Sequence, residues 1–368
     1  MLNIDQGFKE KFNNFIKNEI KPFHQEWENN GLVDRNLFLK AGEQGFLCPS
    51  IPQELGGKGF PFRYNAFITQ ELTKHGATGP MFYIQSNIIA PFLHKFASDF
   101  IKGKYIPKLV SGESIGAMAN SEQIAGSDFS LLQTEAKEVD GGFILNGSKI
   151  YISNAFNADI FIVLAKLNSG FGLFLVEDNF KGFKRGEILK KMGLKSQDTG
   201  ELLFKDCFIP KENYLGFSKE SKEFLQTRLR ISMALFAQGL LKNTLKITKE
   251  YASRRELFNK TVIDFQNTKF ILSKIYADSI ILDTFLNSII LKIENQETPW
   301  MDANIAKMKV TENLGEAVDR CSQFFGAAGY MEGSEISKNF RDARIQRIYG
   351  GTTEIIKSLI FKEFLSNF

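Results

Sequence analysis

The chain has 368 residues, of which 43% are hydrophobic and 24% charged, and its net charge is +4. This composition is typical of a globular protein with room for two or three domains. The small net charge, with no Lys or Arg run on one face, argues against a nucleic-acid ligand, and no apolar stretch reaches the roughly 18 residues of an integral membrane segment.

Three cysteines lie far apart in the sequence, at Cys48, Cys207 and Cys321. Neither they nor the three histidines show the spacing of metal ligands, so no metal site is predicted. An odd number of distant cysteines also favours a reducing compartment, and we expect a cytoplasmic protein. Residues 1–19 mix charges with single apolar residues, unlike a signal peptide.

The first third of the chain shows helical periodicity. Apolar residues recur at steps of three and four from Phe8 to Ile20 and from Leu37 to Phe46. Further amphipathic stretches cover about 64–74 and 88–109. The pattern predicts an N-terminal helical domain over residues 1–115.

Short apolar runs bounded by turn residues follow. Gly141-Gly142 and Asn146-Gly147 indicate turns, so residues 143–147 and 149–153 are expected to form two separate strands. Further runs lie at 160–165, 171–176, 202–204 and 207–210. Their spacing predicts a middle antiparallel β domain over residues 116–216.

Helical periodicity then returns. Apolar stripes mark helices at about 225–251, 265–294, 302–325 and 353–365, and Gly326 is expected to form an αL cap. Long helices joined in this way form bundles. We expect a C-terminal four-helix bundle over residues 217–368.

Two segments of the middle region suit an anionic, aromatic ligand. Around Gly126, the small and hydroxyl residues of 121–128 allow backbone N–H groups to approach a pyrophosphate, although a surface turn looks the same. Tyr151 and Ser153 are expected to share one face of a strand. This face can contact a flavin ring, or it can simply be the half-exposed side of the strand.

Two segments of the last third of the chain likewise allow both a ligand-binding and a purely structural interpretation. Arg255, with Phe258 and Phe265-Gln266 after it, suits a phosphate or the C-terminus of a helix. Gly350-Gly351-Thr352-Thr353 before an apolar run suits a phosphate at a helix start or a simple N-cap.

The order of these segments is more specific than any one of them. Together with Phe325–Tyr330 and Arg341–Arg344, they resemble the acyl-CoA dehydrogenase family over nearly the whole chain, most closely its long-chain and isovaleryl branch. The resemblance implies an α+β fold with an N-terminal helical domain, a middle β domain and a C-terminal bundle. It also implies a homotetramer, or at least a homodimer, because neighbouring subunits share the FAD sites.

The function implied by the resemblance is that of an FAD-dependent oxidoreductase acting on the CH–CH group of an acyl thioester of CoA or acyl-carrier protein. Electron-transfer flavoprotein is the implied electron acceptor. Ser121, Tyr151 and Ser153 take the places of the family's usual Thr, Trp and Thr beside the flavin, and Ser127 and Arg230 match residues of the acyl site. The implied FAD contacts are Met118, Ser121, Gly126, Ser127, Tyr151, Ile152, Ser153, Arg255, Phe258, Phe265, Gln266, Gln323, Phe324, Gly326, Ala327, Thr352 and Glu354.

Two departures from the family pattern stand out. The usual Thr-Glu-Pro is Ser121-Glu122-Gln123, and we still expect FAD to bind because proline supplies only rigidity. The second departure concerns the catalytic Glu that removes the weakly acidic α-proton. Gly350 stands at the first family position for this base, and Leu229, which cannot accept a proton, at the second.

The missing base leaves three interpretations open. The protein is an acyl thioester oxidoreductase with another base, or a flavin monooxygenase or oxidase of the same fold, or a non-catalytic FAD-binding protein. Restoring Glu at position 229 or 350 tests whether only the base is absent.

Overall fold

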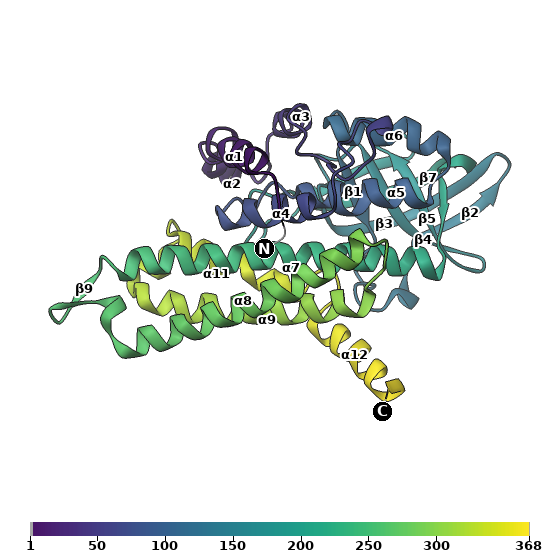
Figure 1. Cartoon of the computed structure of the whole chain (residues 1–368). Helices are drawn as coiled ribbons and strands as arrows, with labels where there is room; N and C mark the ends of the chain where they lie inside the picture. Colours follow the sequence, from purple (N-terminus) through teal and green to yellow (C-terminus); the bar gives the residue numbers. More distant parts are fainter. Residues whose placement is uncertain (1–2, 368) are drawn as a thin grey trace.

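The computed structural model describes residues 3–367, which form helical, β and helical regions in chain order (Figure 1). The N-terminal helices are α1 (Gln6–Phe15), α2 (His24–Asn30), α3 (Asn36–Glu43), α4 (Arg63–Lys74), α5 (Ala90–Phe96) and α6 (Asp99–Ser111). The stretch expected as one helix at 88–109 is divided, because Ser98 begins α6 by accepting a hydrogen bond from Ile101 N.

The middle region is one eight-stranded sheet in the order β6-β7-β3-β2-β4-β5-β8, with β1 beside β4. Its strands are β1 (Gly116–Ala119), β2 (Glu135–Val139), β3 (Gly142–Ser153), β4 (Ile160–Leu167), β5 (Gly170–Glu177), β6 (Phe183–Ile188), β7 (Thr199–Pro210) and β8 (Tyr214–Gly216). Most neighbours are antiparallel, as expected, but β4 pairs in parallel with both β1 and β2. The sheet is therefore mixed.

The turn expected at Asn146-Gly147 was wrong. Strand β3 runs through this point, and the register against β7 shifts between Leu145 and Gly147, as in a β-bulge. Gly147 has φ +140°, and a Cβ there would lie 2.6 Å from Thr134 Cα. The glycine thus allows a close approach inside a strand. Residues 202–204 and 207–210 likewise belong to the single strand β7.

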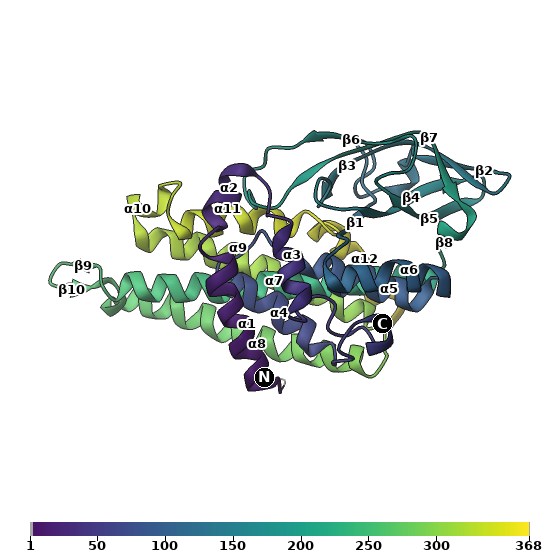
Figure 2. The same ribbon diagram turned by 90° about the horizontal axis from the view of Figure 1, so that it is seen from above.

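The C-terminal region is a bundle of α7, α8, α9 and α11, and α4 also packs along α7. Gly326 has φ +57° and ψ −141°, so the expected αL cap was wrong. In Figures 1 and 2 a small hairpin projects from the end of the bundle farthest from the sheet. The elements are α7 (Lys219–Ala252), β9 (Glu256–Leu257), β10 (Lys260–Thr261), α8 (Gln266–Glu294), α9 (Trp300–Phe325), α10 (Ala327–Tyr330), α11 (Glu335–Arg344) and α12 (Thr353–Asn367).

Helix α7 lies at the boundary between two hydrophobic cores. One core joins the N-terminal helices to the sheet, and Leu229 packs against it. The other fills the bundle and includes Ile231. A side chain in this part of α7 therefore lies where the three regions meet. No helix within residues 3–367 is long and apolar enough to cross a membrane.

One buried carboxylate connects all three regions. Asp342 of α11 is 1% exposed and accepts hydrogen bonds from Leu194 N of the β region, at 2.6 Å, and Thr78 Oγ1 of the N-terminal region, at 2.8 Å. Lys338, one turn earlier, forms an ion pair with it at 2.8 Å. Burial opposes ionisation, but Lys338 and the other donors outweigh it, and the pKa of Asp342 lies below its usual value.

Candidate functional site

The two positions that lack the base meet in space. A Cβ placed on Gly350 would lie 3.5 Å from Leu229 Cγ. The same Cβ would lie 2.2 Å from Met233 Sδ, and Gly350 has φ +63°, so a side chain at position 350 would clash and be strained. Leu229, in contrast, lies on a regular helix and is partly exposed. Of the two, position 229 is the one that can carry a carboxylate without strain.

Arg230 lies directly beside these positions. Its guanidinium approaches Gly351, where a Cβ would be 3.6 Å from Nη2, and it is 5.9 Å from the Trp300 ring centroid. Nη1 donates to Gln226 Oε1 at 3.3 Å, and Nε is buried without an acceptor. Arg230 is 4% exposed, and burial lowers the pKa of its guanidinium to about 10.

Lys307 of α9 is a second buried cation at this site, and sequence reasoning missed it. It is 0% exposed, and its Nζ donates to Gly351 O at 2.7 Å. Burial and the charge of Arg230 lower the pKa of Lys307 to about 8, against a small opposing effect of Glu354. A single lysine in an amphipathic helix carries no sequence signal of burial, because the long side chain usually reaches solvent.

Two tyrosines adjoin the base positions, but neither replaces the base. Tyr349 precedes Gly350, and its hydroxyl donates to Gln346 Oε1 at 2.8 Å. Burial, and then the neighbouring Tyr83, raise the pKa of Tyr349 well above its usual value. Burial also raises the pKa of Tyr83 to about 12. Both phenols therefore stay protonated at neutral pH.

The predicted flavin residues of the middle region gather on one part of the sheet. Strand β1 carries the partly buried Met118, and Ile150 N donates to Ser121 O at 3.0 Å, which holds the loop after β1 against β3. The next residue, Tyr151, lies at a bulge in a left-handed conformation (φ +62°), and its side chain is 59% exposed. Such a backbone is unfavourable for tyrosine and is commonest at functional sites.

The rest of this group follows the expected pattern of exposure. Ile152 is buried, whereas Ser153 is partly exposed. Gly126 and Ser127 lie in an exposed loop, and no atom comes within 4 Å of a Cβ placed on Gly126. An open aromatic face and an open glycine loop fit a flavin ring and a pyrophosphate, respectively.

A buried ion pair stabilises this loop and was not predicted. Lys149 Nζ lies 2.8 Å from Glu122 Oε1, and both side chains are almost fully buried. Glu122 also accepts hydrogen bonds from the backbone N–H groups of Gln133 and Thr134. Burial opposes ionisation of Glu122, but Lys149 and these donors outweigh it, and the pKa of Glu122 lies below its usual value. The pair holds the loop without the family's proline.

The remaining predicted FAD residues are divided between two places. Thr352 begins α12 by accepting a hydrogen bond from Ile355 N, and Glu354 is exposed on the first turn. The other group lies at the end of the bundle farthest from the sheet (Figure 1). It comprises Arg255, Phe258, Phe265 and Gln266 around the hairpin and Gln323, Phe324, Gly326 and Ala327 at the end of α9.

The ends of two bundle helices meet at this distant end. The Tyr251 and Phe325 rings stack with centroids 4.2 Å apart, which joins the end of α7 to the end of α9. Phe258 at the hairpin tip is 89% exposed. Because the sheet lies at the opposite end in both views (Figures 1 and 2), a single chain cannot bring the two groups of predicted FAD residues together.

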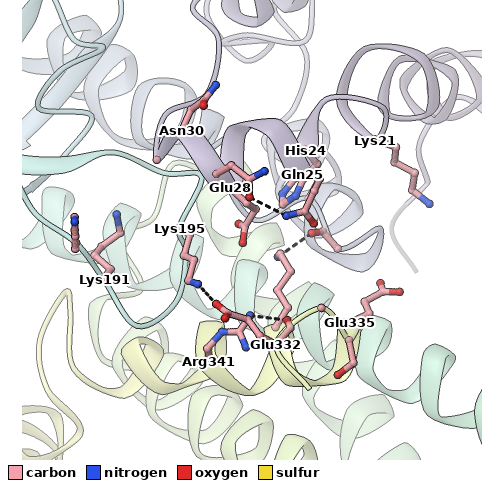
Figure 3. Close-up of a pocket in the computed structure, with 18 of the residues that line it drawn as sticks. Lys21, His24, Gln25, Glu28, Asn30, Lys191, Lys195, Glu332, Glu335 and Arg341 are labelled. Carbon is pink, nitrogen blue, oxygen red and sulfur yellow. Dashed lines mark hydrogen bonds and ion pairs between the residues drawn. The ribbon is translucent and has the colours of Figure 1, made fainter. Parts of the chain in front are cut away.

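A cavity of about 990 Å³ lies elsewhere, between α2, the loop after β6 and the α10–α11 segment (Figure 3). Lys195 forms an ion pair with Glu332, and Arg341 Nη2 donates to Glu332 O at 3.2 Å. Burial, and then the charge of Lys338, lower the pKa of His24 to about 3, so His24 is neutral. Of residues 3–367, none of those predicted for the site lines this cavity.

Three family models match consecutive parts of the chain. They are the N-terminal domain of acyl-CoA dehydrogenase at residues 5–113, the middle domain at 117–207 and the C-terminal domain at 221–365.

Individual proteins match over nearly the full chain. The long-chain specific acyl-CoA dehydrogenase of Rattus norvegicus is 35% identical over 370 residues, which cover 98% of this chain and 86% of that protein. The isovaleryl-CoA dehydrogenase of Oryza sativa subsp. japonica is 29% identical over 369 residues, which cover 97% of this chain and 90% of that protein. The crystal structure of acyl-CoA dehydrogenase from Geobacillus kaustophilus has a TM-score of 0.94, with 31% identity and 99% of both chains covered.

Proposed function

The chain belongs to the acyl-CoA dehydrogenase family, whose members are FAD-dependent enzymes, and on that premise we propose that it is an FAD-dependent oxidoreductase of acyl thioesters. The resemblance to long-chain and isovaleryl members that the motifs indicated is confirmed. The proposed reaction is α,β-dehydrogenation of an acyl-CoA or acyl-carrier-protein thioester, or its reverse. The chemistry that FAD supplies when bound is acceptance of a hydride from the β-carbon.

One observation carries this proposal. Leu229 and Gly350 face each other beside Arg230, so the place for a base is preserved although no carboxylate stands at either position. Removal of an α-proton from a thioester needs a positioned base, because the proton is very weakly acidic. We therefore propose that the site binds acyl thioesters and that proton transfer at the α-carbon is the slow step.

The change Leu229→Glu tests the proposal directly. A general base contributes roughly 10²- to 10⁴-fold, so we expect anaerobic bleaching of the flavin by acyl-CoA to accelerate by at least about 10²-fold. Leu229→Gln, which has the same shape without the charge, is the matched control and should stay slow. Gly350→Glu should gain less, because φ is positive and Met233 occupies the space.

The result that contradicts the proposal is specific. Leu229→Glu would have to fold, bind FAD and still show no bleaching with acyl-CoA of any chain length. A non-catalytic role for bound FAD would then account better for the site.

A flavin oxidase or monooxygenase remains the second candidate. The observation that favours it is that Leu229, Met233 and the protonated Tyr349 supply no base, and reaction of a reduced flavin with O₂ needs none at the α-carbon. Stopped-flow mixing of the reduced protein with O₂ distinguishes the two. Reoxidation within milliseconds favours the oxygen-using candidate, and slow reoxidation favours the acyl thioester oxidoreductase.

We further propose a homodimer or homotetramer. The support is that predicted FAD residues lie at opposite ends of one chain, so a complete site needs a second copy to supply Arg255 and Phe258. Exposed apolar side chains on the outer face of α8, including Phe270 and Ile281, are consistent with an interface. Electron-transfer flavoprotein as acceptor and a cytoplasmic location complete the proposal, both resting on the reasoning from the sequence.

A further inference from the structure

The 990 Å³ cavity between α2, residues 188–195 and the α10–α11 segment is lined mainly by polar and charged side chains (Figure 3). Its apolar lining consists of Ala77, Ile188 and Leu189, and no Phe, Tyr or Trp among residues 3–367 contributes to it. The volume is within the range of small-molecule sites. An acyl chain or an aromatic base, however, would find little surface to pack against.

Basic side chains outnumber acidic ones in this lining. The acidic residues are Glu28, Glu332 and Glu335, and the basic residues are Lys21, Lys190, Lys191, Lys195, Lys338 and Arg341. Lys195 pairs with Glu332, and Lys338 pairs with the buried Asp342 at 2.8 Å. Within the described part of the chain, the other four basic side chains form no ion pair with a carboxylate.

The two remaining carboxylates of the lining are bound to neutral groups instead. Glu28 Oε1 accepts hydrogen bonds from the backbone N and the Oγ of Ser196, at 3.2 and 2.9 Å. Glu335 Oε1 accepts one from Asn243 Nδ2 at 3.1 Å. The lining therefore keeps an excess of positive charge that a ligand can neutralise.

The unpaired cations are divided among separate elements. Figure 3 shows Lys21, which precedes α2, and Lys191, which follows β6, on opposite sides of the cavity. Arg341 lies on α11, and its guanidinium is held by Ser337 Oγ at 2.7 Å and Glu332 O at 3.2 Å. Lys191 Nζ donates to Gln197 O at 2.5 Å. Two of the cations are thus positioned, and the positive charge is spread over more than one wall.

We propose that this cavity binds a sugar or polyol that carries two phosphate groups. Lysine ammonium groups and the fork of an arginine are the usual partners of phosphate, and their separation suits two such groups. Neutral donors and acceptors between them, at Gln25, Asn29, Asn30 and Ser334, suit the hydroxyl groups of the ligand. The site is independent of the proposed function, because none of the residues predicted for the acyl and FAD sites lines it.

Calorimetry on the FAD-loaded protein tests this inference directly. The probes are fructose 1,6-bisphosphate, fructose 6-phosphate, inorganic phosphate and ADP. Charge-assisted hydrogen bonds to a second phosphate predict a Kd about 10- to 100-fold lower for the bisphosphate than for the monophosphate. Because the ligand would bind the folded state, the bisphosphate should also raise the Tm.

Variants locate the binding. Lys191→Met removes one positioned cation and should raise the Kd of the bisphosphate about 10-fold or more. Lys190→Glu reverses the charge of an exposed residue and should also weaken binding. Lys184→Glu is the matched control, because Lys184 is exposed on β6 and does not line the cavity. It makes the same change in net charge and should alter the Kd by less than about threefold.

Four outcomes overturn the inference and leave the proposed function in place. They are the absence of binding by the bisphosphate, equal affinity for inorganic phosphate, tighter binding of ADP than of the bisphosphate, and equal weakening by Lys190→Glu and Lys184→Glu. Equal affinity for phosphate would mean that the cavity holds any small anion. Preference for ADP would mean that it recognises a nucleotide. If Lys191→Met does not fold, the wild-type probes and the two surface variants still decide the question.

Discussion

Asp342 and Arg230 are both buried charged side chains of the C-terminal region, but they differ in what surrounds them. The Asp342 carboxylate has a cation, Lys338, and two further donors from the other two regions. The Arg230 guanidinium has one neutral amide and, nearby, a second cation in Lys307. The first arrangement satisfies a charge within the chain, and the second leaves a charge unsatisfied.

The difference is between a buried charge that has its partners within the chain and one that lacks them. A buried ion that keeps its partners helps to specify one arrangement of the three regions. A buried ion without partners destabilises the folded state, and such a cost is commonest where function requires it. The stability of variants at these positions can therefore confirm or contradict the comparison.

The largest effect is expected at Asp342. Asp342→Ala leaves the partly buried Lys338 without its carboxylate and removes the bonds from Thr78 and Leu194, so the free energy of unfolding should fall by about 3–5 kcal/mol. Urea unfolding followed by circular dichroism measures the change. Arg230→Met is the contrasting variant and should be neutral or stabilising, because it removes an unpaired buried charge. If both variants destabilise equally, the comparison fails.

An intermediate effect is expected from Lys307 as a function of pH. Its folded-state pKa is about 8, below the usual 10.5, so between these values the unfolded state binds more protons. The free energy of unfolding should therefore rise as pH increases from about 8 toward 10.5, by roughly 3 kcal/mol from this group. Burial also lowers the pKa of Lys149 to about 8, so Lys149 adds a rise of its own. Lys307→Met should remove only the part that comes from Lys307, measured as urea midpoints between pH 7 and 10.

The control for this rise is Lys195→Met, at the exposed ion pair with Glu332. It should leave the pH dependence in place. A rise of equal size in Lys307→Met would show that other groups titrate in this range, and that Lys307 carries no unsatisfied charge.

The smallest effect is expected at that same exposed pair beside the 990 Å³ cavity (Figure 3). Lys195→Gln should lower the free energy of unfolding by less than about 1 kcal/mol, because solvent screens the ion pair. Adding salt to the wild-type protein should remove the difference. If Lys195→Gln lowered the free energy of unfolding as much as Asp342→Ala does, the ion pair beside the cavity would stabilise the fold as strongly as the buried Asp342 carboxylate.

Three features follow from the amino-acid sequence alone: the family, the order of helical, β and helical regions, and the absence of Glu at 229 and 350. Helical periodicity located α4, α8 and α12, because apolar spacing reflects which face of a helix is buried. Motif order indicated the FAD-binding segments even though each motif alone was ambiguous. The individual FAD contacts, from Met118 to Glu354, remain predictions.

The partners of these residues, in contrast, depend on how the elements pack in three dimensions. This packing placed Leu229 against Gly350, closed position 350 with Met233 and left Arg230 and Lys307 without a carboxylate. Strand β3 also continues through Gly147, because its pairing with β7 outweighs the local turn signal of Asn146-Gly147. The physical reason is the same in each case. Local spacing shows which face of an element is buried, but the packing of elements far apart in the chain decides which side chains become partners.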